Sequence, residues 1–175
     1  MARAGKLDLR KFQQELATRL ASKTAAQVES SRLGLSCAGE RWLIRLPDAS
    51  EVIPLPHIAS VPLTKSWFLG VCNIRGNLYS VVDFSGYLGH ERPTAGAGGT
   101  ERLVLFGPRA GDIRTGIVVE RVLGLRNLAE LAPAAAPEDS PAWYSHRWMD
   151  GEGNAWQEID LARLARDPQF LQVGR

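Results

Sequence analysis

Three side chains could form a catalytic group with a thiol nucleophile: Cys72, with His57 as the base and Asp83 as the residue that orients it. A catalytic thiolate is activated at a helix N-terminus or a sharp exposed turn, where its pKa is lowered. Cys72 instead lies in a run of β-favouring residues at 71–74, which predicts a strand. The histidines of the chain are isolated in loop-like surroundings. The sequence therefore predicts no catalytic residues and a protein that is not an enzyme.

Cofactor and metal chemistry find no support either. The glycine-rich stretch at 96–99 lacks the Lys-Ser/Thr pair and the following helix that a phosphate-binding loop needs. Cys37 and Cys72 lie far apart in β-favouring runs, with no C-x-x-C pair and no histidine at metal-ligand spacing. We therefore expect no cofactor, no metal and two buried free thiols.

Recognition is the chemistry that the sequence favours, and Arg75 is its best candidate. Two β-favouring runs, at 71–74 and 78–82, are separated by Arg75, Gly76 and Asn77. Gly76 can adopt a positive φ at little cost, so the pattern predicts a tight reversal of the chain. Arg75 would be held on a stiff corner, where it either contacts a partner or stays solvated with its stem over apolar neighbours.

Composition limits what such a recognition residue can bind. The chain has 175 residues, and 45% of them are hydrophobic, which suffices for one domain or two closely packed halves. A total of 21 Lys and Arg against 19 Asp and Glu gives a net charge of +2, too small to drive binding to nucleic acid. No apolar run approaches the ~20 residues that span a bilayer, and no secretory signal is apparent. We expect a cytoplasmic protein that does not insert into a membrane.

The elements that must position Arg75 are mainly short strands. Segments 90–100 and 132–141 have the composition of loops, and the first of them would separate two halves. Frequent turn signals between short β-favouring runs indicate a mostly β protein. The predicted strands are 31–37, 41–46, 51–55, 71–74, 78–82, 102–106, 115–119, 121–125, 148–149 and 155–159.

Helical patterns appear near the two ends of the chain. From Asp8 to about Ala26, apolar residues recur at spacings of three and four, which predicts an amphipathic helix. This helix either packs as a structural strap or docks a partner. A short final helix would begin after Asp160 as its N-cap, with Leu161 and Leu164 facing inward.

The tryptophans of the chain have two possible roles, core packing or a stacking surface for a ligand or nucleic acid. A nucleic-acid-binding β-barrel would pair exposed aromatic residues with a positive groove, whereas basic residues here are interleaved with acidic ones. Core packing is therefore the preferred interpretation, and Trp67 is expected to fill a core. Trp143, Trp148 and the neighbouring Tyr144 follow a predicted loop and could instead form a contact surface. The five tryptophans are Trp42, Trp67, Trp143, Trp148 and Trp156.

The pattern W-x-L-G-V-x-N-x-R-G, followed by a strand that ends in aspartate, resembles the signature of CheW-like domains, the adaptor modules of bacterial chemosensory arrays. The flanks FQQELATRLA and EIDLARLARDPQFLQV resemble the PilI branch, which serves type IV pilus and twitching-motility systems. The resemblance covers nearly the whole chain. The matching residues are Trp67, Leu69, Gly70, Val71, Asn73, Arg75, Gly76 and Asp83.

The resemblance implies a fold of two intertwined five-stranded SH3-like β-barrels, with an N-terminal amphipathic helix and a short C-terminal helix. Residues 1–30 would be a helical extension, 31–167 the CheW-like domain with a linker near 90–100, and 168–175 a tail. The implied partners are the cytoplasmic tip of a methyl-accepting chemoreceptor and the regulatory domain of a CheA-type histidine kinase. The receptor would lie in an apolar groove between the barrels.

The resemblance places Asn73 and Arg75 near the edge of that receptor groove, as partner-binding residues. From its residue type, Asn73 is expected to hold the turn by side-chain to backbone hydrogen bonds. Gly70 and Gly76 are interpreted as structural. Asp83 either caps the following turn, which we favour, or orients Arg75.

Two other functions fit parts of the sequence. Within the same superfamily, the chain could be a stand-alone kinase regulatory domain or a coupling protein of another chemosensory pathway. From a different class, it could be a small nucleic-acid-binding β-barrel, although the charge balance disfavours this interpretation.

Overall fold

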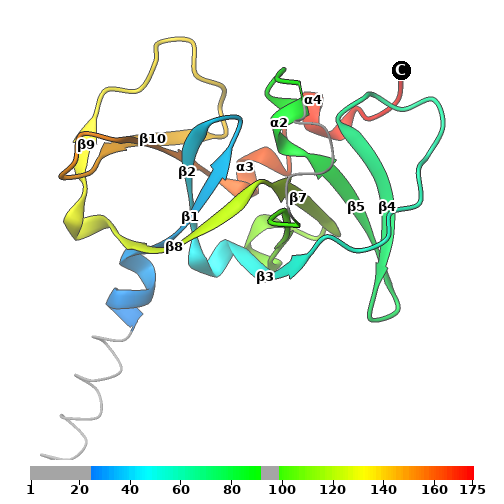
Figure 1. Ribbon diagram of the computed structural model, residues 1–175, viewed down its shortest axis with the longest axis horizontal. Coiled ribbons are helices and arrows are strands. Elements are labelled where there is room, and N and C mark those ends of the chain that lie inside the picture. The colour runs from blue at the N-terminus through cyan, green and yellow to red at the C-terminus, as the bar shows by residue number, and fades with distance from the viewer. Residues whose placement is uncertain (1–24, 92–98) are drawn as a thin grey trace, which may run out of the picture.

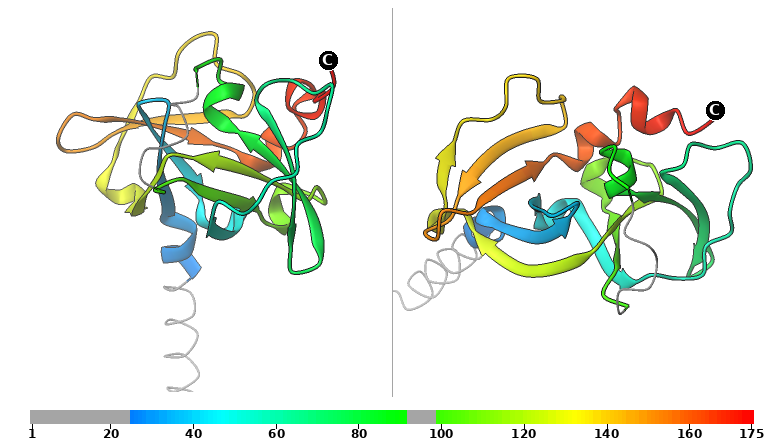
Figure 2. Two further views of the ribbon diagram at one scale, coloured as in Figure 1. Left: turned by 45° about the vertical axis from the view of Figure 1, so that its right-hand side comes forward. Right: turned by 45° about the horizontal axis from the view of Figure 1, so that its top comes forward.

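The structure of the protein is a computed structural model that describes residues 25–91 and 99–175. Its strands form two sheets, and Figures 1 and 2 show these sheets at opposite ends of the molecule. The six-stranded sheet has the order β8-β1-β2-β11-β10-β9. Its strands are β1 (Ser31–Cys37), β2 (Glu40–Arg45), β8 (Arg121–Asn127), β9 (Ala132–Ala134), β10 (Tyr144–Met149) and β11 (Ala155–Ile159).

The five-stranded sheet is formed by the middle of the chain and has the order β3-β6-β7-β5-β4. Both sheets are mixed, because β11 runs parallel to β2 and β5 runs parallel to β7 while the other pairs are antiparallel. The strands of this sheet are β3 (Ala49–Pro54), β4 (Phe68–Ile74), β5 (Asn77–Asp83), β6 (Arg102–Phe106) and β7 (Thr115–Val119).

The helices of the described residues are short and lie between strands or at the C-terminal end. Residues 25–30 are also helical, whereas most of the helix predicted from Asp8 to about Ala26 falls outside the described residues. Asp160 is the N-cap of α3, as predicted, and Leu161 and Leu164 are fully buried. The helices are η1 (Leu46–Asp48), α2 (Phe84–Tyr87), η2 (Pro108–Ala110), η3 (Leu128–Glu130), α3 (Leu161–Leu164) and α4 (Pro168–Leu171).

The prediction of a mostly β fold is confirmed, but the prediction of two closed five-stranded barrels needs correction. In the described part of the chain, each sheet runs between two unjoined edge strands, β8 and β9 in one and β3 and β4 in the other. The sixth strand arises because β9 pairs with β10, in a segment whose composition predicts a loop. An edge strand tolerates Pro133, because one side of it needs no hydrogen-bonding partner.

The chain changes sheet at two places. It leaves the six-stranded sheet at η1 after β2, forms all five strands of the other sheet, and returns between β7 and β8. The predicted linker near 90–100 lies between α2 and β6, on the path from β5 to β6 within the five-stranded sheet. The division into residues 1–30, 31–167 and 168–175 remains a prediction.

The main hydrophobic core joins the two sheets. Trp42 of β2 contacts Phe84 of α2 with ring centroids 5.3 Å apart, and Trp143 packs on both rings. A second cluster lies on the other face of the five-stranded sheet, where adjacent Val81 and Val82 of β5 point to opposite clusters. The middle of this sheet, around Val81 and Val82, is therefore covered by a buried cluster on each face, which stiffens the elements that carry the W-x-L-G-V-x-N-x-R-G motif.

The predicted burial is confirmed for both cysteines and for three of the five tryptophans. Both cysteines are buried and free. Trp42, Trp143 and Trp156 are at most 5% exposed, while Trp67 and Trp148 are half-buried. Trp67 stacks on Phe170 of α4 with ring centroids 6.4 Å apart, so the motif tryptophan packs at the edge of the main core.

Candidate interaction surface

The arginine corner is the turn between β4 and β5, and its tip projects from the five-stranded sheet (Figure 1). Ile74 pairs with Asn77, so the loop consists of Arg75 and Gly76 alone. Their φ angles are 51° and 82°, as a type I′ hairpin turn requires. The sequence predicts the reversal and the positive φ of Gly76. The left-handed backbone of Arg75 was not foreseen, and it costs about 1–2 kcal/mol in a residue with a Cβ.

Asn73 fixes this turn from within. Its side-chain oxygen accepts a hydrogen bond from the backbone N–H of Gly76 at 2.9 Å, as expected from its residue type. Asn73 is exposed and lies directly opposite Leu78 of β5, which is 60% exposed. Facing residues of an antiparallel pair point to the same side of the sheet, so an amide and an apolar side chain lie beside the arginine corner.

Glu51 of β3 orients the arginine. Its carboxylate accepts a hydrogen bond from the Nη2 group of Arg75 at 2.7 Å. The Arg75 side chain is 75% exposed and the Glu51 side chain 31%, so the guanidinium is tethered at one nitrogen and otherwise faces solvent. Sequence reasoning missed Glu51, because the pair joins strands at opposite edges of the sheet and leaves no local signal.

Asp83 has neither of the two roles predicted from the sequence, which were to cap the following turn or to orient Arg75. It occupies the N-cap position of α2, but its side chain makes no capping hydrogen bond. Arg75 is oriented by Glu51 instead. Asp83 is only 5% exposed, and its carboxylate packs close to Gly86, where a Cβ would stand 3.1 Å from Oδ2. The favoured prediction of a side-chain cap is therefore wrong.

Gly70 allows a loop to close on the edge of β4. Its φ is 133°, and a Cβ there would stand 2.1 Å from the carbonyl oxygen of Ala59. Two backbone hydrogen bonds, at 2.8 and 2.9 Å, pair Ala59 with Val71 beside it. Leu69 packs, partly buried, against the second core cluster. These motif residues hold the base of the hairpin, while Arg75 and Asn73 lie at its tip.

The residues considered for thiol catalysis do not form an activated site. Cys72 is 3% exposed in the middle of β4, and burial raises the pKa of its thiol, the opposite of what a nucleophile needs. His57 is exposed in the loop before β4. Within the described part of the chain, no three His, Cys, Asp or Glu side chains are grouped as a metal site would require.

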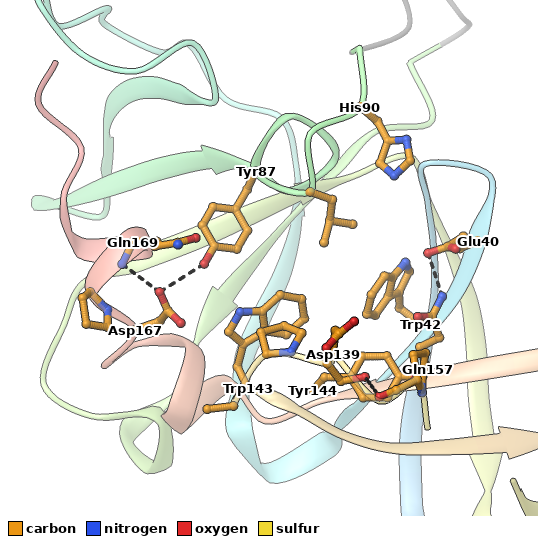
Figure 3. A pocket seen from close by; sticks show the side chains of 16 residues that line it. Glu40, Trp42, Tyr87, His90, Asp139, Trp143, Tyr144, Gln157, Asp167 and Gln169 are labelled. Carbon is orange, nitrogen blue, oxygen red and sulfur yellow. Dashed lines mark hydrogen bonds between the residues drawn. The ribbon is translucent and has the colours of Figure 1, made fainter. Parts of the chain in front are cut away.

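A separate cavity lies between the two sheets, with Trp42 of β2 on one side and Tyr87 of α2 on the other (Figure 3). Neither Asn73 nor Arg75 lines it. This cavity is therefore not the receptor groove that the resemblance implies, because that groove would have Asn73 and Arg75 at its edge. The surface that combines Asn73, Arg75, Glu51 and Leu78 is called the hairpin surface below.

The fold and its arginine-tipped hairpin define a class of protein, the CheW-like domain, and the chain belongs to this family through residues 32–169. The family contains non-enzymatic scaffolding proteins, which confirms both the resemblance and the prediction that the chain is not an enzyme. Within residues 25–91 and 99–175, no helix has the length and apolar character needed to cross a membrane.

Two relatives illustrate the similarity. Protein PilI of Pseudomonas aeruginosa is 30% identical over 113 residues, which cover 62% of this chain and 61% of PilI. The match therefore spans less than two thirds of that relative's length. The crystal structure of the scaffolding protein TtCheW from Thermoanaerobacter tengcongensis resembles the fold with a TM-score of 0.66 at 17% identity, covering 83% of this chain and 97% of that chain.

Proposed function

We propose that the protein is an adaptor that couples methyl-accepting chemoreceptors to a CheA-type histidine kinase, in a chemosensory pathway that controls type IV pili and twitching motility. It acts by protein contacts alone, in the cytoplasm. Membership in the CheW-like family and the similarity to PilI support this proposal. The receptor contact is assigned to the hairpin surface, and the kinase contact to other parts of the two sheets.

The receptor assignment rests on the backbone conformation and the exposed side chain of Arg75. Its backbone has a strained positive φ that glycine would adopt at lower cost, and its side chain is 75% exposed yet held by Glu51. Strain at a rigid, exposed and charged corner points to a function. The exposed ion pair with Glu51 is worth only about 0–1 kcal/mol, which does not exceed the cost of the strained backbone. Gly76 and Asn73 then keep the corner in one geometry.

The chemistry of the corner suits the tip of a receptor helix pair. A guanidinium is planar, always charged and carries five donors, so it can pair with a receptor carboxylate or with backbone carbonyl groups while Nη2 stays on Glu51. Leu78, at 60% exposure, adds an apolar contact beside it. A contact of this kind sets the register of the complex and gives modest affinity, which the multivalency of an array would strengthen.

The test compares receptor binding by two charge-reversal variants. Arg75→Glu should weaken binding to the cytoplasmic fragment of a candidate receptor at least tenfold, because a carboxylate replaces the guanidinium and repels Glu51. The matched control Arg166→Glu reverses an exposed arginine near α4 and should leave affinity within twofold of wild type. Both variants should keep the wild-type melting temperature within a few degrees.

The double variant Arg75→Glu with Glu51→Arg separates orientation from charge. It restores the ion pair with the arginine on β3, so stability should match wild type while receptor affinity stays low. Unchanged receptor capture by a folded Arg75→Glu variant would remove Arg75 from the proposed interface.

A further inference from the structure

The cavity between the sheets has the size and lining of a small-molecule site. Its volume is about 770 Å³, within the range of about 300–1,000 Å³ that ligand pockets occupy. A single protein side chain would fill only a small part of it. Four aromatic residues line it, Trp42, Tyr87, Trp143 and Tyr144, all labelled in Figure 3.

The described residues that line the cavity include three acidic side chains, Glu40, Asp139 and Asp167, and one histidine, His90, but no lysine or arginine. The carboxylate of Glu40 accepts a hydrogen bond from the side chain of Gln157 at 2.6 Å, and that of Asp167 accepts one from the backbone N–H of Gln169 at 2.8 Å. Glu40 and Asp167 lie on opposite sides of the aromatic residues in Figure 3, with Asp139 between them. Glu40 and Asp139 are exposed, so their charges face the opening. Burial, followed by the charge of Asp167, raises the pKa of Tyr87 to about 12.

A buried hydroxyl group at the wall of the cavity lacks a partner. Tyr144 is 9% exposed, and its hydroxyl oxygen makes no hydrogen bond within the described residues. Buried polar groups in folded proteins are almost always paired, and an unpaired one destabilises the fold. An N–H group of a ligand in the cavity would supply the missing partner, whereas a quaternary ammonium group would not.

We propose that this aromatic, acid-rimmed cavity binds a small organic cation with an apolar or aromatic body, such as a quaternary or aryl ammonium compound. Tyr87, the half-buried ring of the four, would receive the cation by cation–π contact, with the nearly buried rings of Trp42, Trp143 and Tyr144 forming the wall behind it. Glu40 and Asp139 would add attraction at the opening. None of the hairpin-surface residues takes part, so the proposal stands apart from the receptor assignment.

The probe is phenyltrimethylammonium, titrated into the full-length ¹⁵N-labelled protein while the indole N–H signals of Trp42 and Trp143 are followed. Saturable shifts of these two signals are expected. Benzenesulfonate, an anion of similar size, should bind at least tenfold more weakly. Raising the salt concentration should weaken binding of the cation, because salt screens the attraction of the exposed carboxylates.

Two variants test the role of the rim. Glu40→Gln combined with Asp139→Asn should lower affinity for the cation at least threefold. The matched control Glu138→Gln neutralises an exposed neighbour that does not line the cavity and should bind as wild type does. Equal binding of benzenesulfonate, or unchanged affinity in the double variant, would overturn the proposal.

A third probe distinguishes a small molecule from a protein side chain. Nα-acetylarginine methylamide carries a guanidinium group and so mimics an arginine side chain of a partner protein. It should bind at least fivefold more weakly than phenyltrimethylammonium, since it cannot fill the aromatic part of the cavity. Tighter binding of the arginine compound would overturn the small-molecule assignment in favour of a protein partner.

Discussion

Gly70 lies where the backbone of β4 meets the backbone of Ala59, and its replacement tests how the hairpin is held. In Gly70→Ala the new Cβ would stand 2.1 Å from the carbonyl oxygen of Ala59, at a φ of 133°. Strain and overpacking should together lower the free energy of unfolding by about 2–4 kcal/mol. Urea denaturation measures this loss. Gly39→Ala is the control, because φ there is also positive but nothing lies within 4 Å, so about 1 kcal/mol is expected.

The buried thiol of Cys37 should make the free energy of unfolding decrease at alkaline pH. Burial first, and then the charges of Glu120 and Asp83, raise the pKa of its thiol above the ordinary value of 9.0. Above pH 9 the unfolded chain releases this proton and the folded chain keeps it, so stability falls as pH rises. The loss should approach about 1.4 kcal/mol per pH unit for this thiol. Urea denaturation of wild type and Cys37→Ala between pH 7 and 10 measures it, and equal slopes would contradict the assignment.

The four-residue helix α4 stabilises the motif through one side chain. Phe170 stacks on Trp67 and Phe106 with centroids 6.4 and 6.0 Å apart, and meets Tyr87 edge-on at 5.4 Å. Phe170→Ala should therefore lower the free energy of unfolding by about 3–5 kcal/mol. Leu171→Ala in the same helix removes a side chain that is 52% exposed, and should cost less than about 1 kcal/mol in the same denaturation experiment. Equal losses in both variants would show that Phe170 does not anchor the helix.

Local patterns predicted the strands well, because alternation and turn residues act over a few positions. The predicted bounds of β1, β6, β7 and β11 are those of the structure. Sheet membership could not be predicted, since the parallel pairs β2 with β11 and β5 with β7 join distant segments. The same limit applies to the candidate site. The hairpin and its turn bond from Asn73 follow from local residue types, whereas the contact of Arg75 with Glu51 depends on tertiary placement.

The path of the chain links the two sheets into one unit. The five-stranded sheet is one continuous segment inserted between β2 and β8, so the six-stranded sheet is built from two separate parts of the chain. The main core contains buried residues of both, and α3 and α4 add theirs from the C-terminal end. Such an arrangement should make the whole molecule unfold in one cooperative transition. For the proposed adaptor function, this coupling would hold the hairpin surface and the six-stranded sheet in a fixed relative position.

Phe84 is the residue through which this coupling is best tested. It is fully buried at the start of α2, beside the five-stranded sheet, and its ring contacts Trp42 of the six-stranded sheet. Phe84→Ala should cost about 3–5 kcal/mol, and the loss should be shared by both sheets. Hydrogen exchange followed by mass spectrometry would show faster exchange in peptides of β1 and β2 as well as β5 and β7, to the same extent. Leu78→Ala, at an exposed site on β5, should leave both sets unchanged. Faster exchange confined to the five-stranded sheet would mean that the two sheets open independently, and that the shared core does not couple them.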